Sequence, residues 1–286
     1  MSFPVIDMRA EEFPSLLREI PQPPKQLRYR GKLPPTHLKL LAVVGSRKYT
    51  TYGQQVVNKL IDGLRDYPIG IVSGLALGMD SLAHEAALRN NLYTLAIPGG
   101  GLNDDVIYPA KHRSLARKIL NAEGGLLSEF DNDFKATIWS FPQRNRLVAG
   151  ISHATLLIEA GEKSGTLITA RLATDYNRDL LVVPGSIFSM NTVGTHQFLK
   201  LGATPVTEAS DILQVLGIDS KKTSKTKNNA NLSPQESLVM DNLDEPKDKD
   251  SLIRLCDLNA VEASTLLMTM ELKGLIKNEY GLYYKT

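Results

Sequence analysis

The chain has 286 residues, a formal net charge of +2 and a single cysteine. This length suffices for one large domain or two ordinary ones, and 42% hydrophobic with 22% charged residues is an ordinary globular composition. Because the net charge is small, any nucleic-acid binding must depend on a local basic patch. The lone Cys256 excludes an internal disulfide framework and the usual cysteine-rich zinc sites.

The first 40 residues are expected to form an irregular segment that packs on the core. Prolines interrupt any long helix there, at Pro21, Pro23, Pro24, Pro34 and Pro35. The N-terminus lacks the basic start and apolar run of a signal peptide, and no apolar stretch approaches transmembrane length. We therefore expect a cytoplasmic protein that has no membrane partner.

Residues 41–218 predict an α/β domain. Short apolar runs typical of buried strands alternate with helical patterns of apolar residues. The expected strands are 41–44, 69–72, 92–97, 126–128, 155–158 and 180–183, and the expected helices lie near 57–64, 81–88, 115–120, 147–151 and 167–176. This alternation predicts a mostly parallel sheet that is covered by helices on both faces.

The end of the chain predicts a linker and a second, small domain. Residues 219–232 carry lysines among Asn, Thr and Ser and almost nothing apolar, which indicates a flexible basic linker. Residues 233–286 predict three helices, beginning near Ser233, Asp250 and Asn259, and a terminal hairpin, a pattern that suggests a winged helix. The third helix is not basic as a DNA-reading helix should be, so we expect it to contact protein or nothing.

In parallel sheets the loops that follow the strands meet at one edge and form the ligand crevice. Polar or glycine-rich loops follow several of the expected strands: Gly45-Ser46-Arg47, Ser73-Gly74, Pro98 to Gly101, Ser128-Glu129 and Pro184-Gly185-Ser186. We expect these loops to converge.

The strongest local signal is the run Phe141 to Arg146 together with Ser164-Gly165-Thr166. The guanidinium groups of Arg144 and Arg146 suit phosphate oxygens, and Asn145 can read a base edge. A turn that begins a helix offers N–H groups and a positive dipole end to an anion. These residues predict a site for a phosphorylated ligand. The alternative is that the arginines form surface ion pairs and Ser164 caps a helix.

Other segments could extend this site. Gly45-Ser46-Arg47 lies between a strand and a helix, as phosphate-binding turns do, although it is not a dinucleotide fingerprint. Lys111 and Arg113 either contact a polyanion backbone or belong to a solvated helix start. Phe141 either stacks on a base or packs in the core.

The sequence offers few combinations of residues that could form a catalytic site. The five histidines show no metal-ligand spacing, and the cysteine is far from the crevice motifs. Glu129 and Glu159 end expected strands and could act as acids or bases, but we favour a role in holding the arginines of the motif. The sequence therefore predicts no catalytic residue, no metal and no cofactor.

The ordered set of motifs resembles the DNA-processing protein family, DprA or Smf, over roughly residues 13 to 216. The matching motifs are Val44-Gly45-Ser46-Arg47, Ser73 to Asp80, Tyr108-Pro109, Ser128-Glu129, Phe141 to Arg146, Ser164 to Ala170 and Pro184-Gly185-Ser186. The resemblance implies an extended Rossmann-like domain that binds single-stranded DNA, forms a homodimer and loads RecA recombinase during natural transformation.

We expect one groove that tracks a single strand without sequence preference. Its predicted residues are Gly45, Ser46, Arg47, Ser73, Gly74, Lys111, Arg113, Phe141, Arg144, Asn145, Arg146, Ser164, Gly165 and Thr166. Self-association is expected to use the region 180–213, which contains the apolar residues Phe188, Phe198 and Leu199.

The competing class is an enzyme, a nucleoside-monophosphate phosphoribohydrolase of the lysine-decarboxylase-like family. Members of that family carry an arginine motif and then Pro-Gly-Gly-x-Gly-Thr, with a glutamate in the next helical turn. Here Gly165-Thr166 is followed by residues 167–170 without a carboxylate, and Pro98 to Gly101 lacks both the threonine and the glutamate. Because the carboxylate is missing where the chemistry requires it, the sequence favours a binding protein.

Overall fold

The computed structural model describes residues 3–219, 232–243, 245–256, 258–279 and 281–285. Two compact units make up the chain, Met1–Ser220 and Lys221–Thr286. The predicted linker 219–232 lies outside the described residues, apart from its first and last residue. No helix within the described residues is sufficiently long and apolar to traverse a lipid bilayer.

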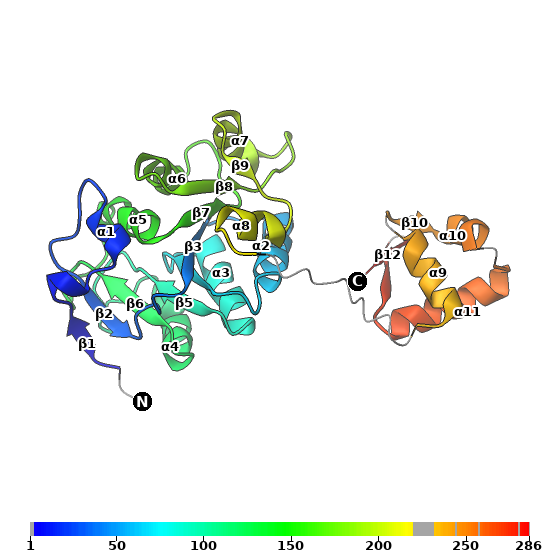
Figure 1. Cartoon of the computed structure of the whole chain (residues 1–286), viewed down its shortest axis with the longest axis horizontal. Helices are drawn as coiled ribbons and strands as arrows, with labels where there is room; N and C mark the ends of the chain where they lie inside the picture. The colour runs from blue at the N-terminus through cyan, green and yellow to red at the C-terminus, as the bar shows by residue number, and fades with distance from the viewer. Residues whose placement is uncertain (1–2, 220–231, 244, 257, 280, 286) are drawn as a thin grey trace. The chain divides into compact units, whose positions relative to one another are not determined.

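The first unit is built on a sheet whose described strands have the order β1-β2-β6-β5-β4-β3-β7-β8-β9 (Figure 1). The strands are β1 (Val5–Asp7), β2 (Arg28–Gly31), β3 (Lys39–Val44), β4 (Ile69–Ser73), β5 (Tyr93–Ala96), β6 (Gly125–Ser128), β7 (Ala154–Leu157), β8 (Asp179–Val182) and β9 (Thr204–Pro205). In the part of the sheet with the order β6-β5-β4-β3-β7-β8-β9, each strand pairs in parallel with its neighbours. Strand β2 pairs antiparallel with both β1 and β6.

Helices follow most of these strands. They are α1 (Ser15–Arg18), α2 (Thr51–Asp62), α3 (Met79–Arg89), α4 (Arg113–Asn121), α5 (Ser140–Ile151), α6 (Thr166–Asp175), α7 (Val193–Lys200) and α8 (Ala209–Val215). Short 3-10 helices lie at Ala10–Glu12, Ala110–His112 and Met190–Thr192. The alternation of strand and helix along the chain confirms the predicted α/β class.

Strand β3 shows why both faces of the sheet are covered. Its side chains alternate between the faces, as they must in a strand. Leu41 and Val43 pack into the core beneath α2, α3 and α8. Leu40, Ala42 and Val44 pack into the opposite core beneath α1, α5, α6 and α7. The continuous apolar run that predicted a buried strand is therefore shared between two cores.

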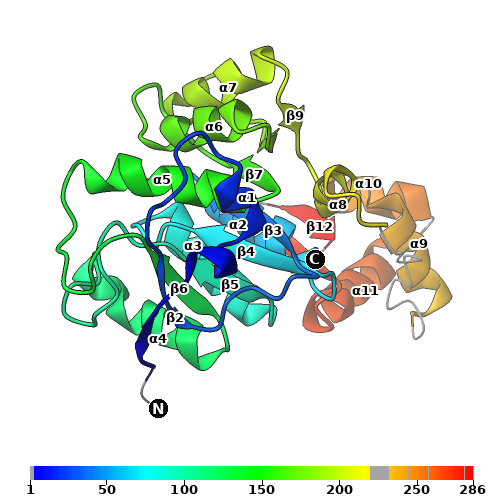
Figure 2. The same cartoon turned by 60° about the vertical axis from the view of Figure 1, so that its left-hand side comes forward.

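The first 40 residues are more regular than the sequence predicts. Strand β2 pairs with β6 from Arg28 opposite Ser128 to Gly31 opposite Gly125, and so extends the sheet. The N-terminal segment also lies over α5, which α1 contacts (Figure 2). The irregular structure predicted here was wrong because both strands are short, β1 is mostly exposed and β2 is half-buried, so they show no alternating apolar pattern.

The described part of the second unit contains three helices and a terminal hairpin, as predicted. Its described elements are α9 (Pro234–Asn242), α10 (Lys249–Cys256), α11 (Ala260–Leu272), β10 (Lys247–Asp248), β11 (Ile276–Glu279) and β12 (Leu282–Lys285), with the sheet order β10-β12-β11. Ser233 and Asn259 cap α9 and α11. The predicted cap Asp250 lies inside the first turn of α10, and Asp248 instead accepts hydrogen bonds from the N–H and hydroxyl of Ser251.

Candidate nucleic-acid interface

The candidate site lies where the strand order of the first unit reverses. From β3 the chain proceeds through β4, β5 and β6 on one side, and it then returns to the other side of β3 as β7. The loops after β3 and β7 separate at this switch point and leave a crevice. A cavity of about 780 Å³ opens there, which we call the strand-end cavity. The predicted residues that line it are Gly45, Ser46, Arg47, Gly74, Phe141, Arg144, Asn145, Ser164, Gly165 and Thr166.

Arg144 forms the floor of the strand-end cavity together with Asp80 and Gly74. The Arg144 side chain is buried, and its Nη1 donates to the carbonyl oxygens of Gly74 and Ile97 at the ends of β4 and β5. Its Nε donates to Asn145 Oδ1 at 3.2 Å. Burial lowers the pKa of Arg144 to about 10, although Asp80 acts in the opposite direction. Arg144 therefore fastens strand ends together as a buried cation.

Asp80 completes the floor from the first turn of α3. Its Oδ2 accepts hydrogen bonds from the N–H groups of Gly74 at 3.1 Å and Ala76 at 3.3 Å. Burial raises the pKa of Asp80, whereas Arg144 and these hydrogen bonds lower it. A side chain at position 74 would collide with both the guanidinium of Arg144 and the carboxylate of Asp80. This is why the turn after β4 requires glycine.

Hydroxyl groups hold the neighbouring loops in place. Thr166 Oγ1 donates to the Gly45 carbonyl at 3.0 Å and so joins α6 to the loop after β3. Ser46 Oγ bonds the backbone of Lys48. Ser73 was predicted to lie in the site, but it is fully buried and donates to the Val43 carbonyl at 2.7 Å. It supports the loops from below.

The beginning of α6 is less open to an anion than its sequence predicts. The N–H of Thr166 donates to Ser164 Oγ at 3.3 Å, and that of Leu167 donates to the Ser164 carbonyl at 3.1 Å. The N–H of Ile168 donates to the Gly165 carbonyl at 3.2 Å. These bonds satisfy donors that a helix usually leaves free in its first turn. Attraction of a phosphate must therefore depend mainly on side chains.

Three exposed cations, Arg47, Lys48 and Lys163, line the strand-end cavity, and we call them the rim. Within the described part of the chain none of them has a carboxylate at ion-pairing distance. The guanidinium carbon of Arg47 lies 5.4 Å from the centre of the Phe141 ring. Tyr108 packs on the same ring at 5.7 Å. The rim thus combines unpaired positive charge with an accessible aromatic surface.

Besides Ser73, three predicted residues do not line the strand-end cavity. Lys111 and Arg113 are exposed near the beginning of α4, and Arg113 donates to the Asp105 carbonyl. Arg146 lies in a neighbouring cavity, where it pairs with Glu129. Because helical residues two positions apart point in nearly opposite directions, Arg144 and Arg146 cannot both face the same cavity.

The two strand-end glutamates have different partners. Glu129 holds Arg146, as predicted. The prediction for Glu159 was wrong, because its carboxylate accepts from the N–H of Thr50 at 2.9 Å and from the Thr50 hydroxyl. Glu159 lies two residues beyond the end of β7, and its partner Thr50 is the N-cap residue of α2, at the end of the helix where N–H groups lack intrahelical acceptors. Among the described residues no group of three or more His, Cys, Asp or Glu is arranged to hold a metal ion.

Several residues of the cavity were not selected from the sequence. Lys48 and Lys163 are the most informative, since each stands directly beside a predicted residue in a loop that follows a strand. Their position was a usable signal. Asp80 and Asn191 carried no such signal. The burial of Asp80 and the hydrogen bond from Asn191 Nδ2 to the Lys48 carbonyl oxygen arise only in the folded chain.

Comparison with known proteins identifies relatives across most of the chain. It is 34% identical to protein Smf of Escherichia coli strain K12, over 98% of this chain and 77% of that protein. It is 38% identical to DNA processing protein DprA of Streptococcus pneumoniae, over 74% of this chain and 73% of that protein.

Solved structures give the same result. The X-ray structure of DprA from S. pneumoniae matches with a TM-score of 0.68 and 36% identity, covering 75% of this chain and 74% of that one. DNA processing protein A from Helicobacter pylori, whose structure was described for its single-stranded DNA binding mode, matches with a TM-score of 0.66 and 31% identity. That match covers 75% of this chain and 96% of the other. These likenesses confirm the extended Rossmann-like fold.

The family described as DNA recombination-mediator protein A matches residues 4–217, which include every element of the strand-end cavity. The chain therefore belongs to this family, as its motifs predicted.

Proposed function

We propose that this protein binds single-stranded DNA in the strand-end cavity and acts as a non-catalytic recombination mediator. The observation that carries the proposal is the rim, because Arg47, Lys48 and Lys163 are exposed cations that have no acidic partner among the residues that the structure describes. Cations that contact phosphates give affinity without reading sequence. The Phe141 ring beside Arg47 offers a surface on which any base can stack.

A single strand suits this cavity better than a duplex does. Its volume of about 780 Å³ accommodates nucleotides whose bases have turned away from their neighbours. In a duplex the base faces are already stacked and the edges are paired, so no face is available to Phe141. We therefore expect tighter binding of single strands at equal salt concentration.

The test is a fluorescence-anisotropy titration with a labelled oligothymidine strand several tens of nucleotides long. If the three rim cations contact phosphates, the logarithm of the binding constant falls against the logarithm of salt concentration with a slope of about −2. Binding that is independent of salt, or equally strong for a duplex of the same length, would contradict the proposal.

The same protein preparation distinguishes a binder from a phosphoribohydrolase. AMP should compete poorly for the strand, and no adenine should appear on prolonged incubation with AMP. The structure supports this expectation, since Glu159 is engaged with Thr50 and positions 167–170 carry no carboxylate. Catalytic release of adenine that is lost in Arg47→Glu would favour the enzyme.

We propose further that the protein forms a homodimer and delivers RecA recombinase to the bound strand. The exposed apolar side chains of Ile187, Phe188 and Met190 in the loop after β8 support self-association there. Phe198, also named from the sequence, is buried in the core and is not available. Two linked cavities would raise the affinity for a long strand. Sedimentation of Phe188→Asp should give monomers, whereas a monomeric unmodified protein would contradict the dimer.

A further inference from the structure

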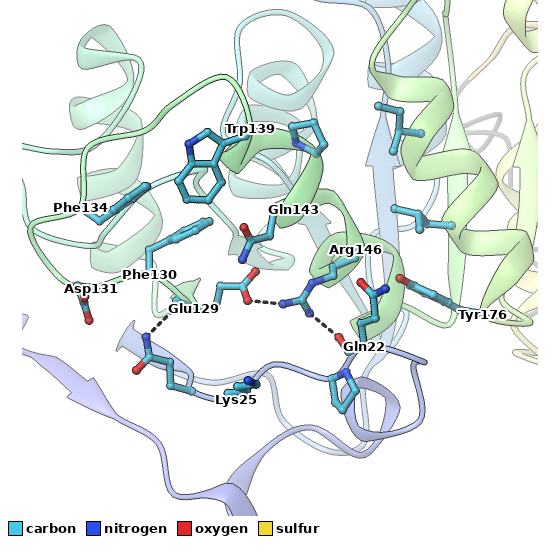
Figure 3. A pocket seen from close by; sticks show the side chains of 15 residues that line it. Gln22, Lys25, Glu129, Phe130, Asp131, Phe134, Trp139, Gln143, Arg146 and Tyr176 are labelled. Carbon is cyan, nitrogen blue, oxygen red and sulfur yellow. Dashed lines mark hydrogen bonds and ion pairs between the residues drawn. The ribbon is translucent and has the colours of Figure 1, made fainter.

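A second cavity of about 950 Å³ adjoins the strand-end cavity, and we call it the side cavity (Figure 3). Its walls come from the N-terminal segment around Gln22 to Gln26, the loop after β6, and the helices α5 and α6.

One wall of the side cavity is aromatic. The rings of Phe130 and Phe134 stack with their centres 4.7 Å apart, and Trp139 lies 5.5 Å from Phe134. Figure 3 shows the three rings grouped on one side, across from Arg146 and Tyr176. Trp139 is 56% exposed, so its large apolar surface is open to a ligand. A planar, unsaturated group is the natural partner for such a wall.

The base of the side cavity holds a buried carboxylate oxygen without a partner. Glu129 is only 8% exposed, and its Oε2 accepts from Arg146 Nη2. The other oxygen, Oε1, is buried and has no partner in hydrogen-bonding geometry. Burial raises the pKa of Glu129, whereas the charge of Arg146 and, to a smaller extent, the nearby amide of Gln143 lower it. A buried acceptor without a donor is costly. A ligand that brings an N–H group into the cavity would satisfy it.

The charges of the side cavity largely cancel. Arg146 pairs with Glu129 and also donates to the Gln22 carbonyl at 2.9 Å. Asp131 pairs with Arg28, and Lys25 adds one positive charge at the edge of the side cavity. A strongly charged ligand therefore gains little here. The cavity suits a neutral, planar group that donates hydrogen bonds.

The two cavities share a wall. Pro142 and Ile168 line both of them. Ile168 is 40% exposed, and Pro142 lies one residue beyond the Phe141 ring of the strand-end cavity. A flexible chain bound at the rim can therefore pass from one cavity into the other without leaving the protein surface.

We propose that the side cavity is a nucleobase subsite for the single strand that binds at the rim. One base crosses Pro142, packs against Trp139 and donates an exocyclic N–H to Glu129 Oε1. This inference rests on the proposed function, and it adds a modest preference for adenine, cytosine or guanine. Thymine is disfavoured because its only ring N–H lies between two carbonyl oxygens, which the carboxylate repels.

The first experiment uses Trp139, the only tryptophan of the chain, as a reporter. Oligodeoxyadenosine is titrated while tryptophan emission and the anisotropy of a labelled strand are both recorded. We expect quenching to saturate together with anisotropy, whereas an abasic strand of equal length binds without quenching. Binding of oligodeoxyadenosine without any change in emission overturns the subsite but leaves the proposed function intact. Absence of any binding refutes the proposed function as well.

Variants locate the base within the side cavity. Trp139→Ala should reduce the preference for oligodeoxyadenosine over the abasic strand by about tenfold, the effect of losing one stacked base, and Trp139→Phe should restore it. Leu201→Ala, at an 80% exposed apolar residue that lines neither cavity, is the matched control and should keep the preference. An equal effect of both alanines would overturn the assignment, with circular dichroism verifying that each variant is folded.

Glu129→Gln tests the hydrogen bond. Its amide can keep the bond from Arg146 through oxygen and present an N–H where Oε1 lies now. The ratio of affinities for oligodeoxyadenosine and oligothymidine should then shift several-fold toward thymine, whose carbonyl oxygens accept. An unchanged ratio would show that Glu129 does not contact the base.

Discussion

The floor and the rim of the strand-end cavity carry charge in opposite ways. On the floor, Arg144 and Asp80 are buried, and their hydrogen bonds are made to backbone groups of the protein itself. On the rim, Arg47 and its neighbouring lysines are exposed and have no acidic partner among the described residues. The difference supports the proposal that the floor builds the site and that the rim contacts the ligand. Changes to the floor should therefore alter stability, and changes to the rim should alter binding.

The largest effect is expected from Arg144→Leu. The substitution leaves two buried carbonyl groups and the carboxylate of Asp80 without their cation, and the free energy of unfolding should fall by about 3–5 kcal/mol. Urea unfolding followed by the fluorescence of Trp139 measures this change. Lys48→Ala on the rim is the control and should alter stability by less than about 0.5 kcal/mol. Equal midpoints for both variants would remove the distinction between floor and rim.

The pH dependence of stability is a second test of the difference between the buried floor and the exposed rim. It depends on His84, which is buried one helical turn beyond Asp80. Burial lowers the pKa of His84 to about 3, and the charges of His112 and Arg144 contribute. Its ring stays neutral, with Nδ1 2.7 Å from Thr94 Oγ1. The unfolded chain, with an ordinary histidine pKa near 6.5, takes up a proton that the folded chain refuses.

The contribution of His84 to the free energy of unfolding is therefore complete above pH 6.5. It decreases as the pH falls toward the pKa of His84 in the folded protein. About 3 kcal/mol should be lost between pH 6.5 and about pH 4. Urea unfolding over this range should show a shallower decline for His84→Gln than for the unmodified protein. Parallel curves would mean that other groups cause the acid sensitivity.

A smaller effect, on binding alone, is expected from Arg47→Glu. Reversal of this charge should weaken single-strand binding by more than about tenfold, or about 1.4 kcal/mol, and leave the urea midpoint unchanged. Anisotropy at fixed salt concentration measures it. Lys111→Glu is the matched reversal outside the cavity and should have a weaker effect. If the two reversals are equivalent, the bound strand extends beyond the rim.

Most of the α/β fold was accessible from the sequence because its central strands are buried on both faces. Such strands appear as continuous apolar runs, as in Leu41–Val44 within β3 and Ile69–Val72 within β4. Helix α5 begins at Ser140, well before the predicted start, because Pro142 and the polar residues after it conceal the helical period. Proline is tolerated there since it falls in the first turn.

The position of the site was also predictable, but the roles of its arginines were not. Strand-end loops converge in any parallel sheet, so Gly45 to Arg47 and Ser73-Gly74 were expected to meet. Which of Arg144 and Arg146 faces which cavity depends on the rotation of α5 about its axis. That rotation is determined by packing against the rest of the fold, which a short motif does not contain.

Gly74 has a consequence for how this chain can change over generations. An alanine at position 74 is incompatible with Arg144 and Asp80 in their present places, and loss of either charged residue leaves the other buried alone. Single substitutions at any of the three positions are therefore expected to destabilise the folded protein. A lineage can keep all three or replace them together, so residues far apart in the sequence are inherited as one unit.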